Sequence, residues 1–167
     1  MSGTTNIIRG IIFTIIYIIT TILVPFFIFR WVMNFQVAIP PDGEIAIEMT
    51  QESYDRIIFW IIAFGLLISG CAFFSYSSPK QSIRRGVFAL IQVIVNCLYL
   101  WSYKFSGATE VRFNIDIPAF SGFVMLNLEQ MILIYLGIYF LTIVIKSYDI
   151  IDFIINRKKI RENRMKE

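Results

Sequence analysis

Some kinds of residue are scarce or missing in this chain of 167 residues, and each absence narrows the range of functions. Histidine does not occur, which removes the commonest general base at neutral pH and the commonest metal ligand. Only 16% of the residues are charged, against about 25% in an average soluble domain. Spacings typical of metal sites, phosphate-binding glycine loops or nucleophile elbows are also missing. We therefore expect no cofactor and interpret the protein as a non-enzyme.

Cysteine is rare as well. Cys71 and Cys97 are the two cysteines, and both lie inside apolar stretches. Thiols in such stretches usually behave as small buried hydrophobic groups. We expect no disulfide between them.

Apolar residues, in contrast, are abundant and occur in long runs. They make up 57% of the chain, above the roughly 45–50% of a soluble domain. Four runs are long enough to cross a bilayer as helices, at about residues 7–33, 53–76, 79–105 and 121–155. The predicted fold class is an all-α membrane protein, a four-transmembrane-helix bundle. Residues 1–156 would form one four-span domain and residues 157–167 a basic tail.

The first run shows no small-residue cleavage site of the kind that ends a signal peptide. We expect it to be retained as a membrane helix. Pro25 lies within this run, and a proline inside a helix removes one backbone hydrogen bond. A kink in the outer third of the helix is the predicted result.

Two further helix starts carry local signals. Thr50 or Ser53 can cap the second helix, since a side-chain oxygen at the N-cap accepts from a free backbone N–H. For the third helix, Ser78 as N-cap, Pro79 as first helical residue and Gln81 as reciprocal cap predict a start at residue 79.

The distribution of Lys and Arg predicts the orientation, because basic residues are retained on the cytoplasmic side. One side of the predicted layout holds eleven of them: Arg9, Lys80, Arg84, Arg85, Lys146, Arg157, Lys158, Lys159, Arg161, Arg164 and Lys166. The other side holds four: Arg30, Arg56, Lys104 and Arg112. Four spans then place both termini in the cytoplasm.

Both predicted outer loops contain a strand pattern. Residues 44–49 follow a Pro-Pro-Asp-Gly turn signal and alternate apolar with polar residues, as do residues 110–117, which end at Pro118. We predict a small two-stranded β element in the extracytoplasmic loops, lying over the outer helix ends. Since a two-stranded ribbon is marginal in water, its apolar face must rest on the helices, on lipid or on a neighbouring subunit.

Polar residues recur at helical spacing within the predicted spans. The third helix carries Gln92, Asn96, Tyr99 and Tyr103, with Arg85 near that face. The fourth carries Tyr135, Tyr139, Thr142, Lys146 and Asp149, and the first Thr14, Tyr17 and Thr21. These faces either form interhelical hydrogen bonds or line a pore or cavity. Glu129 is a candidate for an acidic ring at a cation entrance or a plain interfacial carboxylate. Gly65 and Ser69 have the small-xxx-small spacing of close helix contacts.

No charged residue falls near the middle of a span, which argues against an ion-coupled transporter. In the tail, Arg157, Lys158, Lys159 and Arg161 are predicted to contact anionic lipid headgroups or merely to enforce orientation; nucleic acid is not expected as a partner. The leading hypothesis is a multi-pass membrane protein that acts through assembly, as a homo-oligomer or with other membrane subunits. The alternative is an oligomeric ion channel whose third or fourth helix lines the path. A membrane-disrupting effector or a lipid-modifying enzyme is a weaker third possibility.

Overall fold

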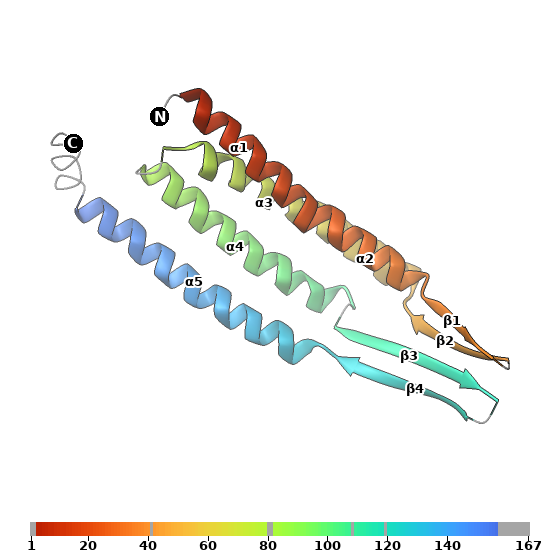
Figure 1. Cartoon of the computed structure of the whole chain (residues 1–167). Helices are drawn as coiled ribbons and strands as arrows, with labels where there is room; N and C mark the ends of the chain where they lie inside the picture. The colour runs from red at the N-terminus through yellow and green to blue at the C-terminus, as the bar shows by residue number, and fades with distance from the viewer. Residues whose placement is uncertain (1–2, 41, 80–81, 108, 119, 157–167) are drawn as a thin grey trace.

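The computed structural model is mostly helical and describes residues 3–40, 42–79, 82–107, 109–118 and 120–156 (Figure 1). The basic tail, with its predicted lipid contacts at Arg157, Lys158, Lys159 and Arg161, lies outside the described residues. The first helical segment consists of α1 (Gly3–Ile18), a π-helical turn η1 (Ile19–Leu23) and α2 (Val24–Met33). The other helices are α3 (Gln51–Ser77), α4 (Ile83–Phe105) and α5 (Glu129–Ile155).

All four segments are long and apolar enough to cross a membrane. This finding agrees with the four runs read from the sequence. The N-terminal end of α1, the connection from α3 to α4 and the C-terminal end of α5 lie at one end of the helices, here called the terminal end (Figure 1). The strands lie at the opposite end, here called the sheet end.

A π-helical turn, η1, ends two residues before Pro25, in the part of the helix where the kink was predicted. Proline cannot donate a backbone hydrogen bond and its ring crowds the preceding turn. A wider i→i+5 turn is one way in which a helix absorbs such a defect. Pro25 then occupies the first turn of α2, where a missing N–H is tolerated.

The helix starts confirm one predicted cap and overturn another. Thr50 is the N-cap of α3, and its hydroxyl accepts a hydrogen bond from the Ser53 backbone N–H at 3.2 Å. The prediction of a third helix starting at Pro79 with Ser78 as cap was wrong. Ser78 instead closes α3 and donates to the Phe74 carbonyl at 2.6 Å. Ser82 caps α4, and Gln81 lies outside the described residues.

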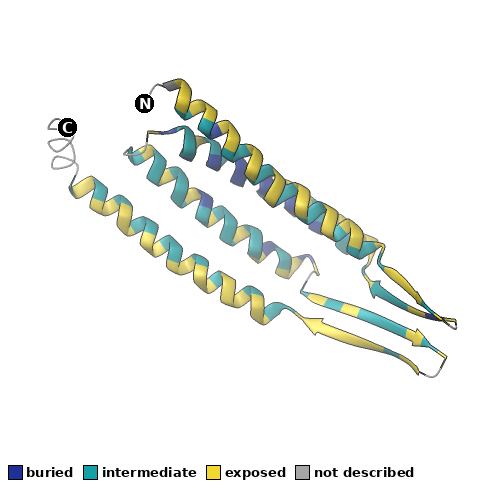
Figure 2. Ribbon diagram, in the orientation of Figure 1, coloured by how far each residue is buried: buried dark blue, intermediate teal, exposed yellow. Residues whose placement is uncertain are grey.

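The helices pack as an open row in place of the expected bundle. Within the described residues, extensive helix packing joins α1 to α3, α3 to α4 and α4 to α5. The core lies along α3, where Ile57, Ile61, Ile68 and Ala72 are each no more than 1% exposed. These residues are separated by four, seven and four positions and therefore share one face of the helix. In contrast, α5 has no buried residue and is exposed along its length (Figure 2).

The β element is a four-stranded antiparallel sheet with order β1-β2-β3-β4, larger than the predicted two strands. Its members are β1 (Gln36–Ile39), β2 (Gly43–Glu48), β3 (Glu110–Ile117) and β4 (Phe120–Asn127). The expected pairing of the two loops is present, because β2 pairs with β3. Residues 121–127, predicted as the start of the fourth helix, belong to β4, and α5 begins only at Glu129.

The sheet extends the helix row past its end and does not fold back over it (Figure 1). Cross-strand partners share a face of the sheet, and the register places apolar residues on one face of all four strands. These residues are Val37, Ile39, Ile45, Ile47, Val111, Phe113, Ile115, Ile117, Phe120, Val124 and Leu126. The opposite face holds the ion pair between Arg112 Nε and Glu48 Oε2 at 3.4 Å.

Candidate functional site

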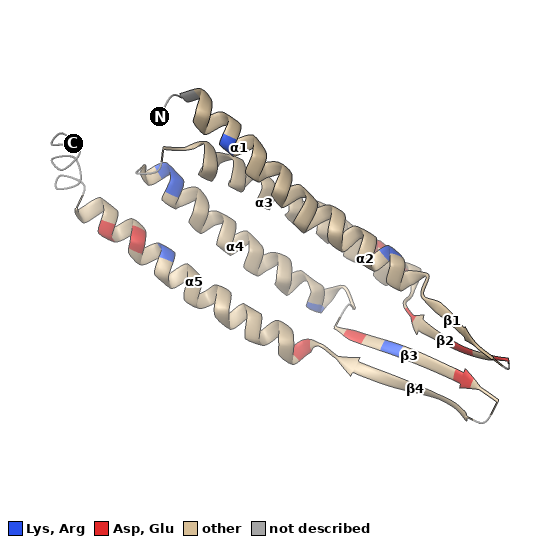
Figure 3. Cartoon of the chain, viewed as in Figure 1, with Lys and Arg blue, Asp and Glu red and all other residues tan. Residues whose placement is uncertain are grey.

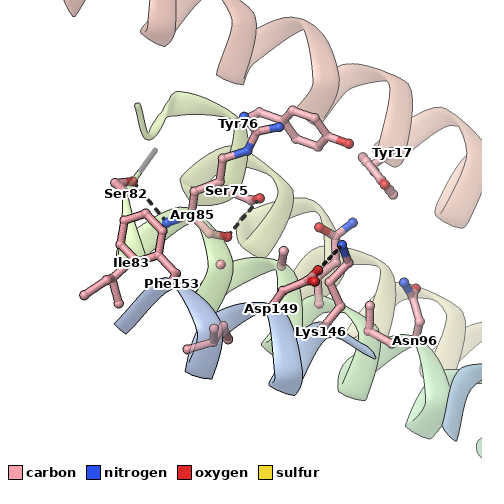
Figure 4. A pocket seen from close by; sticks show the side chains of 15 residues that line it. Tyr17, Ser75, Tyr76, Ser82, Ile83, Arg85, Asn96, Lys146, Asp149 and Phe153 are labelled. Carbon is pink, nitrogen blue, oxygen red and sulfur yellow. Dashed lines mark hydrogen bonds and ion pairs between the residues drawn. The ribbon is translucent and has the colours of Figure 1, made fainter. Parts of the chain in front are cut away.

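A cavity of about 650 Å³ lies at the terminal end of the helix row (Figure 4). Its walls come from all four helical segments: Tyr17 of α1, Tyr76 of α3, Arg85 of α4 and Lys146 of α5 are among the residues that line it. It is the place where polar side chains from distant parts of the sequence meet. We therefore take it as the candidate binding site.

Charged groups in the cavity are unequally paired. Lys146 Nζ lies 3.3 Å from Asp149 Oδ2, one turn further along α5. Arg85 has no ion-pair partner among the described residues; its guanidinium lies 6.0 Å from the centre of the Tyr76 ring. Arg9 of α1 approaches the same ring at 5.6 Å, also without a described carboxylate partner. Two guanidinium groups thus lie near one aromatic ring, and the local charge is positive.

Deeper in the cavity the lining becomes neutral and polar. Gln92 is only 6% exposed and lines the cavity together with Tyr17 of α1. Asn96, one turn further along α4, also lines the cavity. Two of the four residues predicted as a polar face of the third helix therefore contribute to this site.

The other two residues of that face serve packing between helices. Tyr103 donates its hydroxyl proton to the Tyr99 hydroxyl at 2.6 Å, and Tyr99 donates to the Thr21 carbonyl at 3.2 Å. The ring of Tyr103 stacks on Phe29, with ring centres 5.9 Å apart. A relay of hydroxyls thus ties α4 to the first helical segment through the backbone of η1.

Of the polar residues predicted on the fourth helix, Lys146 and Asp149 line the cavity, whereas Tyr135, Tyr139 and Thr142 lie elsewhere. Tyr135 is half exposed, Tyr139 is half-buried, and the Thr142 hydroxyl donates to the carbonyl one turn earlier, at 2.8 Å. None of these three is among the cavity-lining residues. Glu129 lies at the sheet end, where its carboxylate forms an ion pair of 2.6 Å with Lys104.

Sequence reasoning missed the contribution of the α3 C-terminal turn. Ser75 and Tyr76 line the cavity, and the Ser75 hydroxyl reaches the Arg85 carbonyl at 3.5 Å. Their signal in the sequence is their position directly before the short connection to the third predicted helix, which places them beside Arg85. No group of three His, Cys, Asp or Glu side chains able to hold a metal occurs within the described ranges.

A second feature is the uncovered apolar surface at the α5–β4 side of the molecule (Figure 2). Strand β4 lies at the edge of the sheet, and five of its side chains are about half exposed: Phe120, Phe123, Val124, Met125 and Leu126. Its eight residues include no charged residue and no proline. Charged residues and prolines normally protect an edge strand from pairing with another strand, so β4 lacks this protection. The other edge, β1, has only four residues.

Neither a protein-family model, nor a curated protein, nor a solved structure matches this chain. The evidence for function is therefore the geometry of the cavity and of the two sheet edges.

Proposed function

We propose that this chain is an integral membrane protein with four membrane-crossing helices, its terminal end in the cytoplasm and its sheet outside. The length and apolar character of the helices support insertion. The eleven-to-four distribution of Lys and Arg in the sequence supports the orientation, and Figure 3 shows basic residues at both ends and most acidic residues toward the sheet end. Positive residues are kept on the cytoplasmic side during insertion.

Its function in this proposal is assembly with further copies of itself, without catalysis. The observation that carries the proposal is the open architecture: a single row of helices continues into a single-layer sheet whose apolar face and long edge strand are left uncovered. A sheet with one apolar face needs a second layer or a partner to bury it. An unprotected edge strand offers unpaired N–H and C=O groups to another strand.

Strand direction favours one arrangement of the copies. Strand β1 runs away from the helices and β4 runs back toward them (Figure 1). Copies that share one membrane orientation would therefore bring β4 and a partner's β1 together antiparallel, as in every pair within the sheet. Two β4 strands would instead run parallel, which is the slightly less stable pairing. A contact between the β4 edge of one copy and the β1 edge of the next is head-to-tail. Such contacts close into a ring when the rotation from one copy to the next adds up to a full turn.

The charges of the two outer helices are complementary in the same arrangement. Residues 3–39 contain Arg9 and Arg30 and no acid, whereas residues 120–156 contain Glu129, Asp149 and Asp152 against one lysine. Arg9 lies toward the terminal end, as do Asp149 and Asp152, and Arg30 lies toward the sheet end, as does Glu129. In a head-to-tail contact the first segment would thus face opposite charge at both ends.

Cysteine cross-linking tests this arrangement. Ala38 of β1 and Ser121 of β4 are exposed, small, and lie on one cross-strand row through Glu44 and Asp116. In a background without the native cysteines, chains with Ala38→Cys and chains with Ser121→Cys are co-reconstituted in nanodiscs and treated with a short bifunctional maleimide. We expect a covalent dimer from the mixture and little from either variant alone.

The controls separate the competing functions. As a control, chains with Ala38→Cys are mixed with chains that carry Asp116→Cys in place of Ser121→Cys. The yield of cross-linked dimer should fall, because Asp116 lies on the inner strand β3 and β4 separates it from the partner's β1. Dimers from Ser121→Cys chains alone would point to like-edge contacts, and monomeric chains that co-purify with an unrelated subunit would replace self-assembly with an accessory role. Ion flux through the assembled protein that changes with Asn96→Leu would favour the channel alternative.

A further inference from the structure

We propose that the cavity at the terminal end binds the phosphate group of a membrane lipid of the cytoplasmic leaflet. This inference rests on the proposed membrane location, which puts the cavity at headgroup depth. Guanidinium groups recognise phosphate through charge-assisted hydrogen bonds. The ligand class is a phospholipid with its phosphate beside Arg85 and its chains toward the bilayer.

The charge of the cavity matches a phosphodiester. The Lys146–Asp149 pair is internally neutral, so the positive charge of Arg85 remains without a counter-ion among the described groups, and the Arg9 guanidinium lies 5.6 Å from the centre of the same Tyr76 ring. A guanidinium held away from bulk water is stabilised by an anion. The single negative charge of a phosphodiester supplies one.

The start of α4 contributes a dipole of the same preference. Ile83 and Gly86 line the cavity and belong to the first turn of α4, whose Arg85 N–H already donates to the carbonyl and hydroxyl oxygens of Ser82. The N-terminus of a helix favours a nearby anion through the helix dipole. This contribution reinforces Arg85, which belongs to the same turn.

The shape of the cavity favours a lipid over a soluble phosphate. Helices α1 and α5 form opposite walls of the cavity, and they do not pack against each other as neighbouring helices of the row do. A bilayer lipid can therefore reach the cavity from the side. Val93, Ile150 and Phe153 give the cavity an apolar wall on α4 and α5, which suits the glycerol and upper chain region.

Native mass spectrometry of the protein released from nanodiscs tests the proposal. The nanodiscs contain phosphatidylcholine with one tenth phosphatidylglycerol, and in a parallel sample one tenth diacylglycerol, which lacks the phosphate. We expect retained phospholipid adducts on each chain of the wild type and none of diacylglycerol. Arg85→Gln should lower phospholipid retention about tenfold, as expected for one lost charged hydrogen-bonding group.

Matched variants keep the result interpretable. Arg84→Gln removes the same charge from the same turn of α4, but Arg84 contacts Phe74 and Phe88 outside the cavity, so retention should stay within about twofold. Asp149→Asn should increase retention by releasing Lys146 toward the phosphate, a gain that misfolding does not produce. Equal losses in both arginine variants, or equal retention of diacylglycerol, would overturn the proposal.

A soluble arm distinguishes the source of the phosphate. Glycerol 3-phosphate added in excess should leave the lipid adducts in place; complete displacement would overturn the lipid assignment in favour of a soluble phosphate compound. The same spectra report the number of chains per particle. Oligomers that carry no phospholipid adduct would refute the lipid site and leave the proposed assembly intact. Single chains that retain their phospholipid would refute the proposed assembly and leave the lipid site intact.

Discussion

Gly65 is the position where one added methyl group tests the packing of the first helical segment against α3. A Cβ atom built at Gly65 would overlap Cγ1 of Ile22 in η1 and would lie 3.0 Å from its Cδ1 and 3.4 Å from the Thr21 carbonyl oxygen. The Cγ1 atom is bonded directly to the branched Cβ of Ile22, whose χ1 is restricted. Relief therefore requires the two helices to move apart.

The size of the effect follows from two opposing contributions. Overpacking of a well-packed contact costs about 1–3 kcal/mol, while Ala in place of Gly favours a helix by up to about 1 kcal/mol. Gly70, also in α3, has nothing within 4 Å of its built Cβ. Gly70→Ala thus carries the helix contribution without the clash, and we expect Gly65→Ala to be less stable than Gly70→Ala by about 1–3 kcal/mol.

The assay is unfolding in mixed micelles by titration with sodium dodecyl sulfate, followed by tryptophan fluorescence. Combining Gly65→Ala with Ile22→Ala should relieve the clash, so the two substitutions together should destabilise by at least about 1 kcal/mol less than the sum of their separate effects. Equal stability of the two glycine variants, or strict additivity with Ile22→Ala, would refute the predicted contact between η1 and α3.

Three further outcomes are expected. Tyr103→Phe removes one hydroxyl hydrogen bond and should lower the free energy of unfolding by about 0.5–1 kcal/mol in the same titration. Tyr99→Phe removes two hydrogen bonds and should lower it by about twice as much. Equal losses would contradict the relay to η1. Lys104→Gln and Glu129→Gln each break an ion pair whose side chains are 37% and 41% exposed. Each substitution should change the free energy of unfolding by less than about 1 kcal/mol. A larger loss would show that the pair is desolvated. Asp42→Cys, in a background without the native cysteines, should react with an impermeant maleimide on intact cells, and labelling only after lysis would invert the proposed orientation.

The four helices could be predicted from the sequence because each apolar run exceeds the length of a buried strand. The Thr50 cap and two strands, in residues 44–49 and 110–117, could also be predicted, because helix caps and strand alternation depend on residues close together in the sequence. In the cavity, Tyr17, Gln92, Asn96, Lys146 and Asp149 were all found by their helical spacing. That they meet in one cavity could not be found in this way, because spacing along one helix does not indicate which helix faces it.

The start of the fourth helix shows where local patterns fail. Residues 121–127 are mostly apolar and continue into a long apolar run, so periodicity does not separate strand from helix. What decides is the neighbour: every residue of β4 pairs with one of β3 in an antiparallel register. Likewise β1 is too short to be recognised without β2 beside it.

The sequence by itself determined that four long apolar helices form, since length and apolar character depend on the side chains of contiguous residues. Only the tertiary structure decided that the helices form an open row, that the sheet has four strands and a bare edge, and that Arg85, Tyr76 and Lys146 meet in one cavity. The physical reason is that packing between elements depends on shape and pairing over long sequence distances, which hydropathy along the chain does not encode.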